Sequence, residues 1–305
     1  MLKNFSEVTK NVSKAGVAKT VAVAAANDEH SLEAVFKAES EGLIKSVLVG
    51  NKAEILSILE KHHVAKCEED IIDAPDNVAA AGLAVACIRE GKADFLMKGG
   101  LQTADLLRAV VNKETGLNSG RLMTHVVLNE VPNYHKLLLT TDGGMVQYPT
   151  LEQKVEILKN AVETLHALGY ECPKVGVLAA VETVNPKMPE TVEADQIKQM
   201  NLNGEITGCI VEGPISYDLA VSREVAEIKG FKSEVAGDVD ILVSPNITTG
   251  NILGKSLICS AGAKIAGFII GAGVPIILTS RGSSAEEKYL SLVLAAAVSQ
   301  KAVKA

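Results

Sequence analysis

Aromatic residues make up only 3% of this 305-residue chain, and tryptophan is absent. A surface that stacks nucleic-acid bases on aromatic rings is therefore not expected. Acidic residues outnumber basic ones, 37 to 30, for a net charge of −7. Bulk electrostatics thus favour neither nucleic acid nor an anionic membrane as a partner, and a substrate with several phosphates would need a local group of cations.

Paired cysteines and long apolar runs are missing as well. The five cysteines stand singly with no CxxC pair, which predicts reduced thiols in a cytoplasmic protein and neither a disulfide framework nor a zinc site. The first residues are polar and lack the apolar stretch of a signal peptide. The longest apolar run, near 265–278, is broken by glycines and Pro275. It is too short to cross a bilayer and fits a core strand, so we expect no membrane partner.

Several familiar motifs do not occur. No GxGxxG motif follows a predicted strand and no GxxxxGK[ST] motif is present, so neither a dinucleotide site nor a P-loop is predicted. The six histidines form no HExxH pair, and we interpret His62 and His63 as a solvated helix end. No GxSxG motif is present, so an ordinary serine hydrolase is not predicted. We expect no metal site.

Short apolar runs alternate with longer amphipathic segments along the whole chain. This alternation predicts an α/β protein with mostly parallel sheets covered on both faces. We expect one domain from residues 1–130 with 284–305, closed by the last helix, and a second from residues 131–283. The expected strands are 21–26, 46–49, 95–98, 125–128, 137–140, 175–180, 210–211, 241–244, 268–270 and 276–279. The expected longer helices are 31–40, 53–62, 77–90, 103–111, 150–168, 192–200, 253–261 and 284–299.

Ligands of such sheets bind beyond the carboxyl ends of the strands. At the last of these junctions, Ser280 and Arg281 follow a buried strand and precede a helix. Free N–H groups at a helix start attract anions, and a guanidinium adds a permanent charge. Ser284 and Glu287 also have the spacing of a capping box. The pattern fits either an anion site or a simple helix cap.

A second junction joins a strand to a helix through Lys98, two glycines and Thr103. Asp105 and Arg108 lie one turn apart on that helix, away from its buried stripe. They form either a surface ion pair, or a site in which Lys98 and Arg108 receive phosphate.

Two further junctions, 211–218 and 244–255, follow strands and are dense in turn residues. In the second, Asn246 and Asn251 either hold a ligand or close an Asx turn and cap a helix. Their spacing does not decide between these roles.

From about residue 94 onward, the sequence resembles the phosphate acetyl/butyryltransferase family. The segments that carry the resemblance occur in family order: MKGGLQTADLLRAV, LLTTDGGMVQYP, VLAAVETVNPKMPET, VEGPISYDLA, SEVAGDVDILVSPNITTGNILGKSL and LTSRGSSAEEKY. The segment VETVNPKMPET and the chain length are closer to the phosphate butyryltransferase branch.

The resemblance implies a reversible reaction in which acyl-CoA and inorganic phosphate give acyl phosphate and free coenzyme A. It implies two α/β domains similar to the isocitrate and isopropylmalate dehydrogenases, assembled as a homodimer or higher homo-oligomer. Coenzyme A enters as the thioester substrate, and no other cofactor is implied.

The resemblance also assigns roles to residues. Ser280, Arg281 and Glu287 match a family serine, arginine and acid, although the acetyltransferases have aspartate where this chain has Glu287. Arg108 matches a family arginine associated with substrate phosphate or CoA. A further family arginine has no convincing match, because Arg89 stands in a different context.

Chemistry supports these roles. The pKa of a thiol, about 8.5, allows a nearby carboxylate to assist thiolate formation. Arg281 and the helix N–H groups would stabilise the negative charge that develops on the acyl oxygen. Ser280 is not proposed as a covalent nucleophile, since no histidine base is evident. The alternatives are a phosphate acetyltransferase of the same family, a metal-dependent dehydrogenase of the related fold, and a non-catalytic CoA-binding module.

Overall fold

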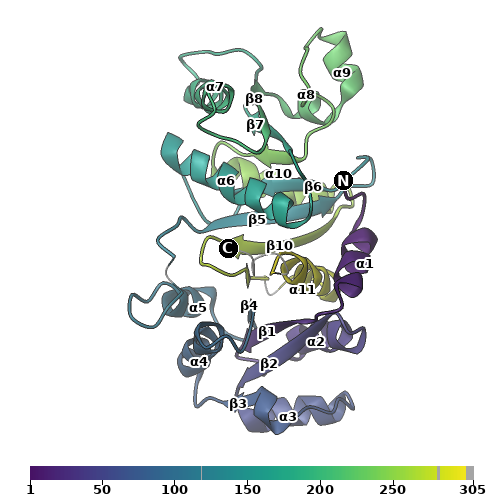
Figure 1. Ribbon diagram of the computed structural model, residues 1–305, viewed down its shortest axis with the longest axis vertical. Helices are drawn as coiled ribbons and strands as arrows, with labels where there is room; N and C mark the ends of the chain where they lie inside the picture. Colours follow the sequence, from purple (N-terminus) through teal and green to yellow (C-terminus); the bar gives the residue numbers. More distant parts are fainter. Residues whose placement is uncertain (118, 280–281, 300–305) are drawn as a thin grey trace. The chain divides into compact units, whose positions relative to one another are not determined.

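The computed structural model describes residues 1–117, 119–279 and 282–299 (Figure 1). The chain divides into two compact units. The terminal unit is made from Ser6–Arg121 and the chain from Ala266 onward, and the middle unit from Met1–Phe5 and Leu122–Ile265. Within the described residues, no helix has both the length and the hydropathy needed to cross a membrane.

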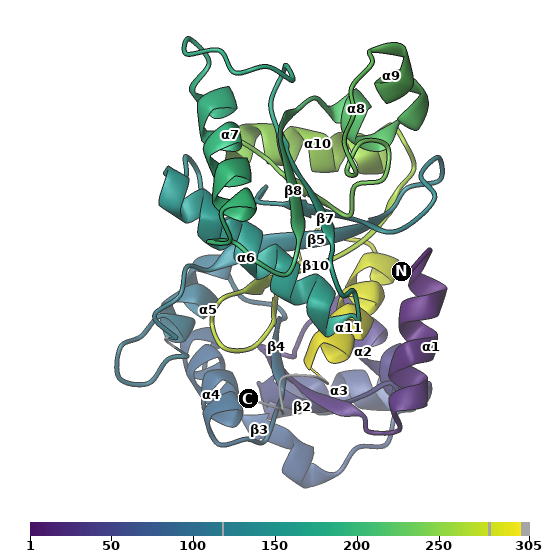
Figure 2. The same ribbon diagram turned by 45° about the horizontal axis from the view of Figure 1, so that its top comes forward.

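The terminal unit has the strand order β3-β2-β1-β4-β11-β10. Its strands pair in parallel, except that β10 and β11 are antiparallel. Helices α2 and α11 lie on one face of this sheet and α4 and α5 on the other (Figure 2). Its strands are β1 (Lys19–Ala24), β2 (Ile44–Gly50), β3 (Ile71–Asp73), β4 (Phe95–Lys98), β10 (Lys264–Ile270) and β11 (Ile276–Ile277). The first two residues of β10, Lys264 and Ile265, belong to the middle unit. Its helices are α1 (Phe5–Ala15), α2 (Glu29–Ser40), α3 (Lys52–Lys61), α4 (Asn77–Arg89), α5 (Thr103–Val110) and α11 (Ala285–Ser299), with a 3₁₀ turn at Glu68–Asp70.

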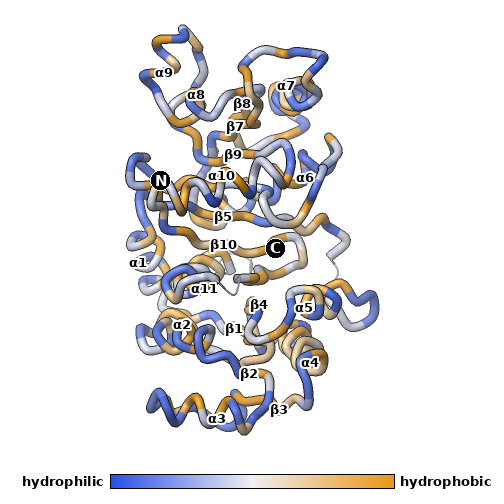
Figure 3. Tube along the Cα trace, turned by 180° about the vertical axis from the view of Figure 1, so that it is seen from behind, coloured by the Kyte–Doolittle hydropathy of each residue, from blue (hydrophilic) through white to orange (hydrophobic). Residues whose placement is uncertain are grey.

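The middle unit has the strand order β5-β6-β9-β7-β8, parallel except for the antiparallel pair β5–β6. Helices α6 and α7 cover one face, and α10 lies on the other (Figure 3). Its strands are β5 (Thr124–Glu130), β6 (Leu138–Thr141), β7 (Lys174–Leu178), β8 (Ile210–Ile215) and β9 (Ile241–Val243). Its helices are α6 (Leu151–Ala167), α7 (Pro189–Leu202), α8 (Tyr217–Val221), α9 (Arg223–Ile228) and α10 (Ile247–Cys259).

Burial explains why the strands read as apolar runs. All four residues of β4 and the last four of β1 are buried, because helices cover both faces of the sheet. Residues 288–299 of α11 are buried as well, so this helix is part of the core of the terminal unit. The predicted α/β class with mostly parallel sheets is confirmed.

The unit boundaries differ from the predicted ones. The sequence placed the first boundary after residue 130 and assigned residues 266–283 to the second domain. In the structure, the segment from Ala266 belongs with the chain ends, since β11 pairs with β4. Strand β5 belongs to the middle unit, since it pairs with β6.

Helix α10 begins well before its predicted start. The sequence favoured a loop up to Leu253, but α10 starts at Ile247, where the Asn246 side chain accepts a hydrogen bond from the Thr249 N–H. Asn251 is therefore a helical residue. The short elements β3, α8 and α9 were not predicted, because three to six residues carry too little periodicity to be recognised.

Candidate active site

The carboxyl ends of β1, β4 and β11 meet at one edge of the terminal sheet. In the parallel pairing, Ala24 is opposite Lys98 and Ile277 is opposite Met97. The loops that follow these strands therefore start side by side. This is the edge at which the sequence predicted ligand binding, and the predicted Lys98 lies on it.

The glycine turn after β4 is packed against the end of β1. The N–H of Gly99 donates to the Ala24 oxygen at 2.8 Å, and the N–H of Gly100 donates to the Ala25 oxygen at 2.8 Å. A Cβ on Gly99 would lie 2.3 Å from the Ala25 oxygen. Only glycine fits at position 99, so this turn is a rigid part of the edge.

Lys98 is buried and holds its own turn. Its Nζ donates to the carbonyl oxygens of Gly99 and Leu101, each at 3.2 Å. A buried ammonium that donates to two backbone carbonyls stabilises the glycine turn. Its predicted contact with substrate phosphate stays a prediction.

Arg108 forms the ion pair that its spacing suggested. Its Nη1 lies 2.9 Å from Oδ1 of Asp105, and its side chain is 71% exposed. A pair this exposed contributes well under about 1 kcal/mol to stability. The guanidinium is therefore accessible to a ligand at little cost, and its role in phosphate binding remains a prediction.

Glu287 lies in the first turn of α11, and Ser284 caps that helix. The N–H of Glu287 donates to Oγ of Ser284 at 3.1 Å, as the predicted helix cap requires. The carboxylate accepts a hydrogen bond from Oγ of Ser283 at 2.7 Å. Glu287 is thus a helical residue whose partly exposed carboxylate is oriented by a neighbouring hydroxyl.

Asp28 connects the start of α11 to the glycine turn. Lys288 Nζ lies 4.0 Å from Oδ2 of Asp28, and a Cβ on Gly100 would lie 3.5 Å from the Asp28 Cβ. The loops after β1 and β4 and the first turn of α11 are therefore neighbours. Ser280 and Arg281, the predicted catalytic pair that precedes this helix, lie outside the described residues, so their assignment stays a prediction.

The other two predicted residues belong to the middle unit and lie on or beside α10. Asn246 caps the helix and lines a cavity of about 520 Å³ beyond the carboxyl ends of β7, β8 and β9. The buried Lys154 forms an ion pair with Glu193 in the same cavity. Asn251 lies one turn later, where its Nδ2 donates to the Gly143 oxygen at 3.2 Å.

Asn251 also lines a second cavity, of about 130 Å³, between β5, β6 and α10. His125 and Asn129 line this cavity from β5, and Gly254 lines it from α10. These three residues were not predicted from the sequence. Positions 125 and 129 are polar and share one face of a strand by the period of two, and that signal could have identified His125 and Asn129.

The turn after β6 is organised by the buried carboxylate of Asp142. It accepts hydrogen bonds from the N–H groups of Gly144, Met145 and Val146, at 2.8, 2.9 and 3.2 Å, and from the N–H of His125 at 3.2 Å. Burial lowers the pKa of the His125 ring, and the nearby Asp142 opposes this only in part. The ring is therefore neutral near neutral pH.

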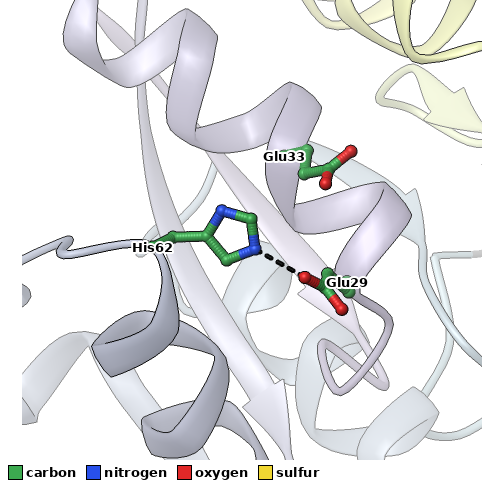
Figure 4. Close-up of side chains that lie close together, drawn as sticks. All are labelled: Glu29, Glu33 and His62. Atoms are coloured by element: carbon green, nitrogen blue, oxygen red, sulfur yellow. Dashed lines mark hydrogen bonds and ion pairs between the residues drawn. The ribbon is translucent and has the colours of Figure 1, made fainter.

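Within the described part of the chain, one group of side chains has a geometry suited to a metal ion: Glu29, Glu33 and His62, with ligand atoms within 4.8 Å of one another. Figure 4 shows the His62 ring directed at Glu29, whose Oε1 lies 2.8 Å from Nε2. The Lys61 ammonium lies 2.6 Å from the same oxygen, and its hydrogen bond is the main reason that the pKa of Glu29 is lowered. These contacts account for Glu29 and His62 as an ion-pair cluster with Lys61 at the end of α3.

Known proteins give the fold and site a context. The sequence model of the phosphate acetyl/butaryl transferase family matches residues 75–296. Phosphate butyryltransferase of Clostridium acetobutylicum is 43% identical over 298 residues, 98% of this chain and 99% of that protein. Phosphate acetyltransferase of Thermotoga maritima is 44% identical over 281 residues, 92% and 95% of the two chains. A crystal structure of a branched-chain phosphotransacylase from Enterococcus faecalis has a TM-score of 0.82 at 34% identity, covering 92% of this chain and 99% of that one. The resemblance read from the sequence is thereby confirmed, and the chain belongs to the phosphate acetyl/butaryl transferase family.

Proposed function

We propose that this protein transfers a short-chain acyl group, butyryl or branched, reversibly between coenzyme A and inorganic phosphate. The observation that carries the proposal is the similarity over 98% of the chain to a phosphate butyryltransferase. The edge of the terminal sheet supports it, because Lys98 and the start of α11 lie among the strand ends where such sheets bind ligands.

The relatives support a short acyl chain without fixing its length. The identities to the butyryl- and acetyl-transferring relatives, 43% and 44%, are nearly equal. The branched-chain phosphotransacylase shares the fold at 34% identity. One methylene in a pocket changes specificity by only about 1–3 kcal/mol, so a few side chains decide the preference.

Charge stabilisation is the chemistry we assign to Arg281. When phosphate attacks the thioester, negative charge develops on the former carbonyl oxygen. The guanidinium and backbone N–H groups at the start of α11 would donate to that oxygen, an effect often worth about 3 kcal/mol per donor. Ser280 would hydrogen-bond the thiol or phosphate, and the acyl group would pass directly between the two substrates.

Glu287 is our candidate for the group that exchanges a proton with the CoA thiol. In the direction of acyl-CoA formation, its carboxylate takes the thiol proton as the sulfur attacks the acyl phosphate. Ser283 holds this carboxylate at 2.7 Å. In the reverse direction the same group returns the proton to the departing sulfur.

Phosphate binding is assigned to Lys98, Arg108, Asn246 and Asn251. Arg108 supports this role because its weak, exposed pair with Asp105 is easily exchanged for a phosphate. Arg108→Ala is expected to raise the KM for phosphate about tenfold while leaving the KM for butyryl-CoA nearly unchanged.

Beyond acyl-CoA and phosphate, we propose no cofactor, nucleic-acid or membrane partner. We also propose that the enzyme acts in the cytoplasm as a homodimer or larger homo-oligomer. All five cysteines are free, which supports a reducing compartment. Light scattering of the purified chain tests the assembly, and a monomeric mass would contradict it.

The direct test of the function is phosphate-dependent thiol release. Purified protein is mixed with butyryl-, isobutyryl- or acetyl-CoA, with phosphate or with sulfate as the matched anion. We expect rapid release of free CoA with phosphate only, and faster turnover of the four-carbon substrates. No release with any thioester would refute the proposal, and equal rates with acetyl-CoA would refute the acyl preference.

A further inference from the structure

The small cavity between α10 and the β5–β6 pair has the features of a built ligand site. Its volume is about 130 Å³, room for a few non-hydrogen atoms. One wall comes from His125, Val127 and Asn129, which alternate along β5 and so share one face. The other wall is α10, which lies along this side of the sheet (Figure 3).

Asn129 presents a buried acceptor with no partner in the described structure. The residue is fully buried. Its Nδ2 lies 3.0, 2.9 and 3.1 Å from the Val127 oxygen, the Leu138 oxygen and Oγ1 of Thr140. These acceptors fix the amide so that nitrogen faces them, leaving Oδ1 unpaired. Buried polar atoms are nearly always hydrogen-bonded, so we expect a ligand to supply a donor to this oxygen.

Gly254 keeps the cavity open at a cost to the helix. It lies one turn after Gly250, and residues four apart share a helix face. Gly250 is required by packing, since a Cβ there would lie 2.5 Å from the Asp142 oxygen. A Cβ on Gly254 would meet nothing within 4 Å. Glycine inside a helix is less stable than alanine, so packing alone does not explain Gly254.

The chemistry of the walls favours an uncharged ligand that carries an N–H group. Val127, Ile258 and Ile265 are apolar. The His125 ring is held neutral by burial, with Asp142 opposing this in part, and the remaining cation of the wall, Lys255, is exposed to solvent. A phosphate would meet no buried cation here. A bare acyl chain would leave Oδ1 of Asn129 without a donor, which is unfavourable.

We propose that this cavity binds an amide of the pantetheine arm of coenzyme A, whose N–H donates to Oδ1 of Asn129 and whose flanking methylenes pack beside Gly254. The pantetheine arm is uncharged, narrow and built from amides separated by methylenes, which matches the walls. This inference rests on the proposed function, because it names the part of the thioester substrate that the middle unit holds.

The first test changes the protein and uses a matched glycine as control. Gly82 lies inside α4 of the terminal unit, is exposed, and has no atom within 4 Å of an added Cβ. Gly254→Ala and Gly82→Ala are both expected to raise the melting temperature by roughly 1–3 °C, because alanine favours the helix. Only Gly254→Ala is expected to raise the KM for butyryl-CoA and acetyl-CoA, about tenfold for each, with the KM for phosphate unchanged.

Other outcomes of this test overturn the inference. An unchanged KM for both thioesters would mean that the cavity holds no part of the substrate. A change in the ratio of butyryl- to acetyl-CoA turnover would make it an acyl pocket, and a change in the phosphate KM alone would make it a phosphate site.

The second test changes the ligand and so does not depend on the folding of a variant. S-butyryl-N-acetylcysteamine carries one pantetheine-like amide, and 2-(butyrylthio)ethyl acetate replaces that amide by an ester without an N–H. We expect wild-type kcat/KM to be about tenfold or more higher for the amide compound. Equal values would contradict a hydrogen bond to Asn129.

Failure of the proposed function can be told apart from failure of the subsite. If wild-type protein releases no thiol with phosphate, the function fails, and calorimetry with free CoA still tests the cavity. Weaker CoA binding by Gly254→Ala than by wild type and Gly82→Ala supports the subsite, and equal binding by all three contradicts it.

Discussion

Two glycines at the sites we assign to substrate, one in each unit, are present for opposite reasons. In the terminal unit, Gly99 is fixed by packing, since a Cβ would come within 2.3 Å of the Ala25 oxygen. In the middle unit, Gly254 has open space around it and lines a cavity with a buried, unpaired acceptor. Gly99 is required for folding. Gly254 lowers the stability of its helix, and we explain its presence by the proposed ligand.

The two sites also differ in charge. The edge of the terminal sheet carries a buried lysine and the start of a long helix, whose first turn contains Glu287. The small cavity beside α10 is lined by amides, a neutral imidazole, glycines and apolar side chains, and its described cation, Lys255, is exposed. We infer that this edge of the terminal unit stabilises the charges of the reaction and that the small cavity of the middle unit recognises the uncharged arm of the thioester.

The largest effect is expected from removing the charge assigned to catalysis. Arg281→Ala should lower kcat by about 10²–10³-fold, because the developing oxyanion loses its cationic donor. Arg223→Ala, at an exposed helix start in the middle unit, serves as the control and should leave kcat within about twofold. Steady-state kinetics of thiol release measures both. A similarly small decrease in kcat in the two variants would contradict the catalytic role assigned to Arg281.

Gly99→Ala should be the most damaging alanine for stability. The added Cβ collides with backbone oxygens that cannot move without breaking the turn, so we expect a loss of about 3 kcal/mol or more. Gly254→Ala should instead gain about 0.5–1 kcal/mol. Urea denaturation of the two variants measures both changes in the free energy of unfolding. Changes of the same sign would contradict the contrast between Gly99 and Gly254.

Glu287→Gln separates a base from a helix cap. The N–H of residue 287 still donates to Ser284, so stability should change by less than about 0.5 kcal/mol. If the carboxylate is the base, kcat falls by about 10²-fold. Ser283→Ala, which removes the hydroxyl at 2.7 Å, should lower kcat by a smaller factor. An unchanged kcat in Glu287→Gln would leave that residue as a cap only.

The smallest effect concerns the pH dependence of the middle unit. Because the folded-state pKa of His125 is lowered, the unfolded chain takes up the proton first as the pH falls. Stability is fully present above the unfolded pKa of about 6.5 and decreases below it. Among the described residues, the carboxylate of Asp142 acts on this ring, and Lys255 lines the same cavity. His125→Gln should flatten the dependence between about pH 8 and pH 5, measured by urea denaturation, and an unchanged slope would contradict a neutral ring.

Much of the fold was predictable from the sequence, because covered parallel strands produce unmistakable apolar runs. Residues 95–98 were predicted as a strand and form β4 with those bounds. The start of α10 was missed, since Asn246 serves equally well in a turn and as a cap. The unit boundaries were missed because pairing between strands far apart in sequence, such as β4 and β11, leaves no local signal.

The candidate site was predictable only in part. The ion pair of Arg108 and the cap by Ser284 followed from helical spacing, and both are present. The burial of Lys98 and the partner-free oxygen of Asn129 depend on how distant segments pack, which spacing does not encode. The roles of Ser280, Arg281 and Glu287 rest on the family resemblance and await the experiments above.

One measurement tests the central claim most directly: the stoichiometry of products formed from butyryl-CoA and inorganic phosphate. Free CoA is counted with a thiol reagent, and butyryl phosphate is trapped as its hydroxamate. Acyl transfer to phosphate predicts equal amounts of both products, with neither formed when phosphate is omitted. Free CoA without butyryl phosphate would mean that the protein hydrolyses the thioester, and would contradict acyl transfer to phosphate.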